Sequence, residues 1–132
     1  MDVPLLGAAN LHKTYVKHAN KIQVLRGLDL DVCEGEFLSV IGNSGSGKST
    51  MLHLLGTLDH PDDGRIYLDN QRIDNLRADD RDQLRNHTFG FIFQFYHLLP
   101  ELNTVDNVLM PAYINQSTMG WWKTRREWRR RA

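Results

Sequence analysis

The sequence predicts an α/β fold in which an antiparallel β layer precedes a partial parallel core sheet flanked by helices. Three observations support this prediction. The first forty residues contain two alternating, strand-like stretches. The short apolar run Phe37–Ile41 is typical of a strand buried on both faces. A glycine-rich turn and then leucines at helical spacing follow that run directly, so strand, turn and helix are expected in that order.

The antiparallel layer is expected from two alternating segments. Residues 5–16 alternate loosely and residues 22–32 alternate clearly, and Gly27 inside the second segment is expected to mark a β-bulge. Residues 48–57 carry apolar side chains at helical spacing and predict a helix, and residues 61–73 predict a turn and a hairpin-like pair of strands.

The second half of the chain predicts helices separated by one strand. Residues 78–87 carry acids early and bases late, which suits the dipole of a short helix. Thr88–Phe93 predicts another buried strand, ending at Gln94. Thr104 is a cap candidate for a helix through residue 114, which Pro111 is expected to limit or kink. We expect a last helix within residues 119–132.

Composition and charge set limits on the function. The chain has 132 residues, 16 basic and 16 acidic, so no global field favours nucleic acid or a membrane surface. Cys33 is the only cysteine, which makes a reducing cytosol the default compartment. No signal-peptide pattern opens the sequence, and no apolar run is long enough to span a bilayer.

The most specific motif is Gly42–Ser49, which fits the pattern G-x-x-x-x-G-K-[ST]. A phosphate chain needs several backbone N–H groups pointing inward, and a glycine-rich turn before a helix supplies them. Lys48 would reach the β- and γ-phosphates, and Ser49 would place its hydroxyl on Mg²⁺. A flexible Gly/Ser turn is the alternative, and the strand and helix signals on either side favour the phosphate site. The expected binding residues are Gly42, Asn43, Ser44, Gly45, Ser46, Gly47, Lys48, Ser49 and Thr50.

Three stretches carry a resemblance to a known family: HKTY (residues 12–15), the long segment 24–70, and FGFIFQFYHLLPELNTVDNVLMP (residues 89–111). The sequence resembles the nucleotide-binding subunit of ATP-binding cassette (ABC) transporters from about Leu5 onward. Within that family the stretch around Gln94 is most similar to the branch that serves lipoprotein release and macrolide export, with the cell-division ATPase a near relative. The resemblance implies an ATP-binding core over residues 5–103 and the start of a helical subdomain over residues 104–132.

The resemblance implies further site residues. Tyr15 would stack on adenine, an interaction of about 1–3 kcal/mol by analogy with base–aromatic stacking; an ordinary strand tyrosine is the alternative. Gln94 would join the Mg²⁺ shell together with Ser49 and sense the γ-phosphate; a polar strand terminus is the alternative. Residues Phe95–Leu102 would meet a membrane-spanning subunit, unless their apolar side chains pack onto this chain itself.

The family's other hydrolytic elements have no counterpart in these 132 residues. The nearest apolar stretch ending in aspartate, Ile66–Asp69, precedes Gln94 and is followed by Asn70. There is no LSGGQ-like segment, and neither His53 nor His97 has the context of a switch histidine. We therefore expect about the first half of a cassette, which binds ATP and Mg²⁺, has no catalytic residue of its own and leaves apolar strands such as Phe37–Ile41 unpaired.

The expected partners follow from the family. The complete family member forms a homodimer and works at the cytoplasmic face of the inner membrane, attached to membrane-spanning subunits; no nucleic acid is expected. The basic, tryptophan-containing residues 121–132 favour the start of the helical subdomain over a lipid- or nucleic-acid-binding tail. Two other functions stay open: a non-hydrolysing nucleotide-binding or interaction module, and an ABC-type ATPase of cell division or DNA repair.

Overall fold

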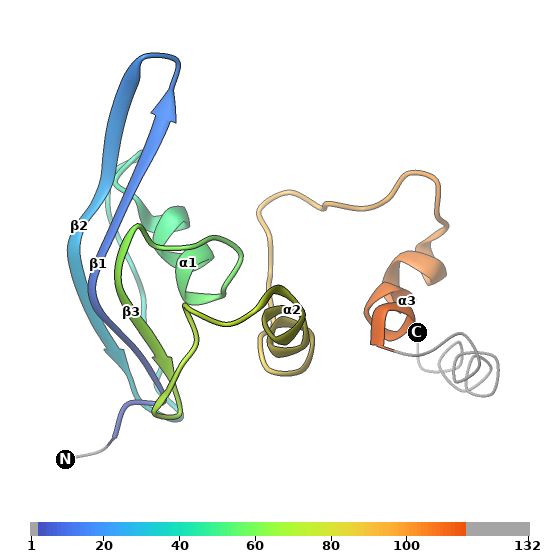
Figure 1. Cartoon of the computed structure of the whole chain (residues 1–132). Coiled ribbons are helices and arrows are strands. Elements are labelled where there is room, and N and C mark those ends of the chain that lie inside the picture. Colours follow the sequence, from blue (N-terminus) through green and yellow to red (C-terminus); the bar gives the residue numbers. More distant parts are fainter. Residues whose placement is uncertain (1–2, 116–132) are drawn as a thin grey trace. The chain divides into compact units, whose positions relative to one another are not determined.

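The computed structural model describes residues 3–115 and divides into two compact units, Met1–Arg81 and Asp82–Ala132, which are described separately. Figure 1 shows the elements in chain order. The division falls inside one helix, α2 (Ala78–His87).

The first unit is built on a four-stranded sheet in which every pairing is antiparallel. The sheet order is β2-β1-β3-β4, so β1 has a neighbour on both sides (Figure 1). The strands are β1 (Leu6–Lys17), β2 (Asn20–Val32), β3 (Asp63–Leu68) and β4 (Gln71–Arg72). Both predicted strands of the N-terminal layer and the predicted hairpin are therefore confirmed.

The bulge predicted at Gly27 is confirmed. Leu11 pairs with Leu28 and the next residue, His12, pairs with Arg26, so Gly27 is an extra residue in β2. Its φ of 78° lies in the left-handed region, which glycine adopts without strain.

A second irregularity lies in the pairing of β1 with β3. The β1–β3 register shifts between Ala9 and His12, and Asn10 has a φ of 51°. Gly64 lies so close that an added Cβ would stand 2.4 Å from the Asn10 carbonyl oxygen. Glycine is therefore required at position 64 for the two strands to approach here.

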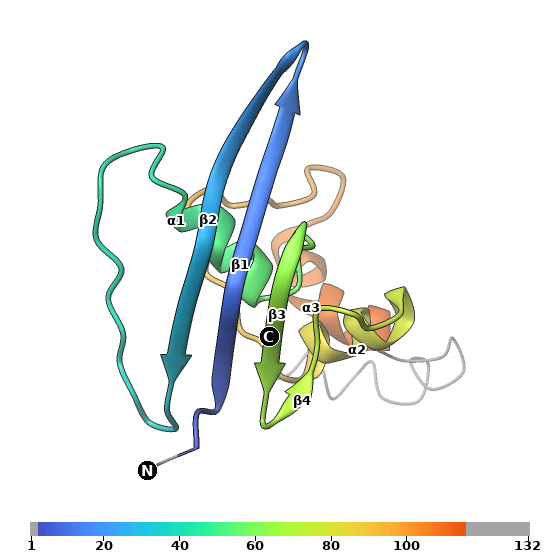
Figure 2. The ribbon, with the colours of Figure 1, turned by 60° about the vertical axis from the view of Figure 1, so that its left-hand side comes forward.

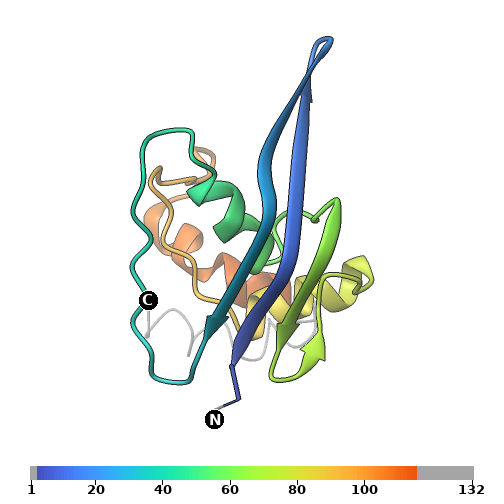
Figure 3. The ribbon, with the colours of Figure 1, turned by 90° about the vertical axis from the view of Figure 1, so that its left-hand side faces the viewer.

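Helix α1 (Lys48–Leu55) lies against one face of this sheet (Figures 2 and 3). Leu54 from α1, Leu11 from β1 and Ile66 from β3 are completely buried. The predicted helical spacing is confirmed, because Met51, Leu54 and Leu55 are the buried residues of the helix.

The prediction of two buried strands, at Phe37–Ile41 and Thr88–Phe93, is wrong for the part of the chain that is described, where neither segment is a strand. Phe37 and Ile41 are 97% and 91% exposed, and Ile92 is fully exposed. A strand needs backbone hydrogen-bond partners, and no described strand pairs with either segment. Most residues of the two segments are exposed in the part of the chain that the structure describes.

The second unit contains the rest of α2, a long connection and α3 (Thr104–Asn115). The helix continues past Pro111, which therefore does not end it. Its cap is Asn103, and not Thr104 as predicted, because the Asn103 side-chain oxygen accepts the N–H of Asp106 at 2.9 Å. The helix expected within residues 119–132 lies outside the described residues.

Candidate functional site

The phosphate loop, Gly42–Thr50, turns from an exposed connection into the first turn of α1 (Figure 3). The Ser46 N–H donates to the Asn43 carbonyl at 3.2 Å and closes the turn. Gly45 and Gly47 have φ values of 79° and 95°, both left-handed. The glycines thus supply the tight curvature that the motif predicts.

The start of α1 offers unshielded backbone N–H groups. Gly47 is the N-cap residue, no side chain caps the helix there, and its first turn has no acidic residue. The first N–H groups of a helix have no partner within the helix and carry its positive dipole end. This start therefore favours an anion.

Gly47 also sets the distance between the loop and the sheet. A Cβ on Gly47 would lie 3.0 Å from the Val24 side chain and 3.1 Å from the Leu25 side chain, both in β2. A Cβ on Gly42 would lie 2.9 Å from the Ser46 hydroxyl. A side chain at Gly47 would push the loop out of its curvature, whereas the Ser46 hydroxyl could rotate away from a side chain at Gly42.

Lys48 is folded back onto its own loop. Its ammonium donates to the carbonyl oxygens of Gly42 and Asn43, each at 2.7 Å, and lies 3.4 Å from the Ser46 hydroxyl. The three acceptors that hold the charge inside the phosphate loop are all neutral. Phosphate oxygens are stronger acceptors for an ammonium than carbonyls, so these contacts can be exchanged for a phosphate.

Ser49 and Thr50 lie in the first turn of α1, with Ser49 exposed and Thr50 half-buried. An exposed hydroxyl beside the loop suits the predicted role of Ser49 on Mg²⁺. The Thr50 side chain lies near the phenol of Tyr15, and its hydroxyl acts to lower the pKa of that phenol. Tyr15, from β1, therefore lies beside the phosphate loop.

Tyr15 is 39% exposed and is tethered by its hydroxyl. That hydroxyl donates to a carboxylate oxygen of Asp59 at 2.8 Å. Partial burial and the neighbouring Asp59 raise the pKa of Tyr15, although the Thr50 hydroxyl and Lys13 act the other way. The phenol is therefore neutral at ordinary pH and available as a hydrogen-bond donor.

Lys13 and Asp59 form a pair that the sequence did not predict as part of the site. Their contact is 2.9 Å, Lys13 is only 8% exposed, and its ammonium also donates to the His60 carbonyl. Desolvation acts to raise the pKa of Asp59, but hydrogen bonds from Lys13, the His60 N–H and Tyr15 outweigh it and lower that pKa. The only signal in the sequence was the lysine of HKTY itself, two residues before Tyr15.

Gln94 and the Phe95–Leu102 segment belong to the second unit. Gln94 is exposed, and its role at Mg²⁺ stays a prediction. Four apolar side chains of the segment are solvent-exposed: Phe95, Tyr96, Leu98 and Leu99. Self-packing, the alternative interpretation, does not bury these side chains within the described residues.

Asn107 of α3 anchors the end of this segment. Its amide accepts the N–H of Leu99 at 2.9 Å and donates to the carbonyls of Leu99, Leu102 and Asn103, each at 3.1 Å. The apolar segment is thus tied to α3 at its C-terminal end. Sequence reasoning missed this residue, because an asparagine inside a helix carries no specific pattern.

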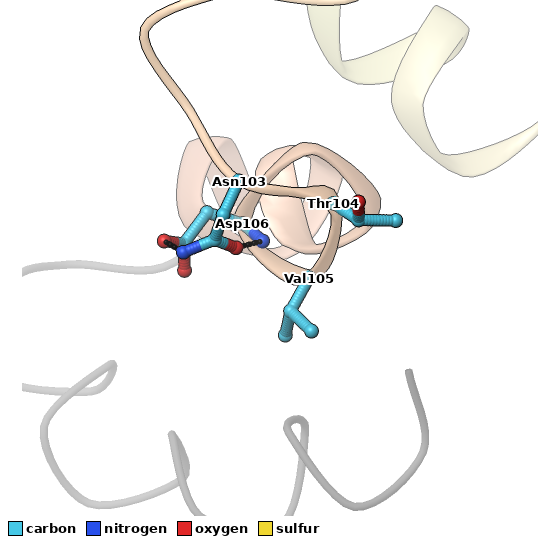
Figure 4. Close-up of a pocket in the computed structure, with 4 residues that line it drawn as sticks. All are labelled: Asn103, Thr104, Val105 and Asp106. Atoms are coloured by element: carbon cyan, nitrogen blue, oxygen red, sulfur yellow. Dashed lines mark hydrogen bonds between the residues drawn. The ribbon is translucent and has the colours of Figure 1, made fainter.

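A hollow at the first turn of α3 does not suit a phosphate. It is lined by Asn103, Thr104, Val105 and Asp106 (Figure 4). The Asp106 carboxylate would repel an anion, and the Asp106 N–H is already taken by Asn103. The start of α1 is therefore the better phosphate site of the two.

The residues of the phosphate loop fit a magnesium-bound nucleotide. In the part of the chain that the structure describes, no group of three or more His, Cys, Asp or Glu could hold a metal ion by itself. A hydroxyl such as that of Ser49 suits a magnesium ion bound largely through phosphate oxygens and water. Within the same residues, no helix is both long and apolar enough to cross a membrane.

The family comparison gives a match over most of the chain. A family model described as "ABC transporter" matches residues 25–131. The chain is 49% identical over 128 residues to the lipoprotein-releasing system ATP-binding protein LolD 2 of Rhodopirellula baltica, covering 97% of this chain and 50% of that protein. It is 44% identical over 118 residues to LolD of Acinetobacter baylyi, covering 89% and 52%. The chain thus spans about half the length of the curated relatives it matches.

Solved structures show a similar fold. A dimeric structure of MJ0796, a bacterial ABC transporter cassette, matches with a TM-score of 0.83 and 37% identity, covering 96% of this chain and 53% of that one. A post-hydrolysis dimer of the same cassette, bound to ADP and Pi, matches with a TM-score of 0.82 and 37% identity, with the same coverage. These similarities confirm the expected ABC-type fold class, although every strand pairing among the described residues is antiparallel and the expected parallel core sheet is not seen there.

Proposed function

Since this chain belongs to the ABC transporter family, we propose that its phosphate loop, Gly42–Thr50, binds the phosphates of ATP. The observation that carries the proposal is the position of Lys48, whose ammonium is held within the loop by carbonyls at 2.7 Å. The uncapped start of α1 adds backbone N–H groups and a positive dipole end beside it. No acidic side chain in the first turn opposes the anion.

Each residue of the proposed site has one role. Backbone N–H groups of the loop contact the phosphates, and Lys48 exchanges its loop carbonyls for phosphate oxygens. Ser49 and, in the complete site, Gln94 would hold Mg²⁺, which would supply positive charge to neutralise the phosphates. Tyr15 offers a ring face to the adenine. We propose residues 5–103 as the ATP-binding core and 104–132 as the start of the helical subdomain.

We also propose the wider role of an ATP-binding subunit of a transporter for lipoprotein release. Two of its relatives, 49% and 44% identical to this chain, carry that name. The exposed apolar side chains of the Phe95–Leu102 segment support docking to a membrane-spanning subunit, since so much apolar surface in one loop favours a partner. The proposed assembly contains a homodimer of cassettes on the cytoplasmic face of the inner membrane.

We propose ATP hydrolysis only for a complete cassette. The 132 residues contain no LSGGQ-like segment and no apolar strand ending in Asp-Glu after Gln94. We therefore expect these residues alone to bind ATP without steady turnover. Steady release of phosphate that Lys48→Ala abolishes would contradict this expectation.

The test of the binding proposal is titration calorimetry of the 132-residue chain with ATP and MgCl₂. The wild-type chain should bind, and Lys48→Ala should weaken binding by about tenfold or more, because a charge-assisted hydrogen bond to phosphate is lost. The matched control is Lys21→Ala, an exposed lysine of β2, which should bind as the wild type does. A wild-type chain that does not bind ATP, or a Lys48→Ala chain that binds it equally well, would reject the proposal.

A further inference from the structure

Three residues outside the phosphate loop form a connected group, the Lys13–Tyr15–Asp59 cluster. Lys13 and Tyr15 come from β1, and Asp59 follows α1 in the chain. The Asp59 carboxylate accepts the Lys13 ammonium on one oxygen at 2.9 Å and the Tyr15 hydroxyl on the other at 2.8 Å. Asp59 therefore joins the two β1 side chains across 44 and 46 residues of sequence.

The carboxylate itself is held in place. Its first oxygen also accepts the N–H of His60 at 2.7 Å, and its ammonium partner donates to the His60 carbonyl at 2.5 Å. Lys13 is 8% exposed, so this ion pair is shielded from water better than a surface pair. A carboxylate fixed by two donors on one oxygen is a rigid acceptor for a third donor on the other.

The third donor is the Tyr15 hydroxyl. One face of the Tyr15 ring is covered by Lys13. The Lys13 ammonium lies over the Tyr15 ring, 5.2 Å from its centroid. A flat base can then stack on the opposite face only. The Thr50 side chain of the phosphate loop lies near the same hydroxyl, so the ring is beside the loop.

From this arrangement we infer that Asp59 is a positioning residue that holds the Tyr15 ring beside the phosphate loop, where its open face receives the base of a bound nucleotide. The inference rests on the proposed nucleotide binding and adds how the base is held. Asp59 itself does not touch the nucleotide. It fixes the Tyr15 side chain before the nucleotide binds, which lowers the entropy cost of ordering that side chain on binding.

The test separates the base from the phosphates. Calorimetry compares ATP with inorganic tripolyphosphate, which has no base, on the 132-residue chain. Tyr15→Phe keeps the ring and removes the tether, so it should weaken ATP binding by roughly threefold to tenfold and leave tripolyphosphate binding unchanged. Asp59→Ala should show the same selective loss. The control Tyr67→Phe removes a hydroxyl from β3 and should change neither affinity.

A double-mutant cycle tests whether Asp59 acts through the Tyr15 hydroxyl. If it does, Asp59→Ala should not change the ratio of ATP to tripolyphosphate affinity further in a chain that already carries Tyr15→Phe. Should Asp59→Ala fail to fold because Lys13 is left without its partner, Tyr15→Phe alone decides the result.

The outcomes are distinct. Wild-type ATP affinity in Tyr15→Phe, or an equal loss of ATP and tripolyphosphate binding in a folded Asp59→Ala, would overturn the positioning role while leaving phosphate binding intact. A wild-type chain that binds neither ligand would instead overturn the proposed function.

Discussion

Gly47 meets two separate requirements at a single residue. Its φ of 95° is left-handed, and a Cβ there would lie 3.0 Å from Val24. Conformation and space therefore both demand glycine at the point where the phosphate loop becomes α1.

The substitution Gly47→Ala should for this reason weaken ATP binding by about tenfold or more, since backbone strain of 1–3 kcal/mol would be relieved by distorting the loop. Calorimetry measures the effect. Gly90→Ala is the matched control, because a Cβ at Gly90 meets nothing within 4 Å and its φ is not left-handed. Equal ATP affinity in Gly47→Ala and the wild-type chain would show that the loop curvature is not needed.

At the residue scale the spacing of the sequence located the candidate phosphate loop, but it did not indicate the contacts around that loop. The loop is a local motif, so its nine residues could be named from their spacing alone. The Lys13–Asp59 pair could not, because its members are 46 residues apart and meet only after β1 and α1 have packed. Asn103 was missed as a cap because Thr104, one residue later, is also a common capping type.

Among the elements, α1 shows how burial divides one helix into two faces. Leu54 is completely buried against the sheet, whereas Leu52 is 55% exposed. The same residue type thus occurs in opposite environments within a single turn.

Leu54→Ala should lower the free energy of unfolding by about 2–5 kcal/mol, because it removes buried methyl groups and leaves a cavity. Leu52→Ala should lower it by less than about 1 kcal/mol. Urea unfolding followed by circular dichroism measures both. Similar losses in the two variants would mean that α1 does not pack on the sheet as described.

The contact between β1 and β3 makes a second prediction at this scale. Gly64→Ala forces a Cβ to within 2.4 Å of the Asn10 carbonyl at a φ of 98°. We expect a loss of more than about 2 kcal/mol in the free energy of unfolding. Thermal unfolding at matched pH would show this as a lower Tm, and an unchanged Tm would contradict the close approach of the two strands.

Elements with local periodicity could be predicted, and those that depend on partners could not. The spacing of Met51, Leu54 and Leu55 is a property of α1 itself. The apolar run Phe37–Ile41 becomes a buried strand only if other strands pair with it, and no strand among the described residues does so. The same reasoning applies to Thr88–Phe93, whose Phe91 and Phe93 rings stack on one another at 5.6 Å.

At the scale of the whole molecule, the carboxylates of Asp59 and Asp74 make the free energy of unfolding depend on pH. Desolvation acts to raise the pKa of both Asp59 and Asp74, but hydrogen bonds from Lys13 to Asp59 and from Arg72 to Asp74 outweigh it, so both pKa values lie below the ordinary 3.8. At a pH between the pKa of a carboxyl in the folded chain and its higher pKa in the unfolded chain, the unfolded chain binds more protons. The stabilisation from each carboxylate is therefore complete above the unfolded-state pKa and is lost as the pH falls through the folded-state pKa.

The free energy of unfolding should therefore fall as the pH is lowered from about 5 to about 3. Asp74→Asn should flatten this dependence, since one of the two carboxyls no longer titrates. Urea unfolding at several pH values provides the measurement. A wild-type stability that rises on acidification would contradict the assigned contacts.

The central claim is that Gly42–Thr50 holds the phosphates of ATP through its backbone N–H groups. Amide hydrogen exchange of the 132-residue chain, with and without ATP and MgCl₂, tests it most directly. Binding should slow exchange across Gly42–Thr50 in the wild-type chain, and at the same ATP concentration, below saturation, it should slow exchange less in Lys48→Ala. Unchanged exchange in this segment at saturating ATP would contradict the claim.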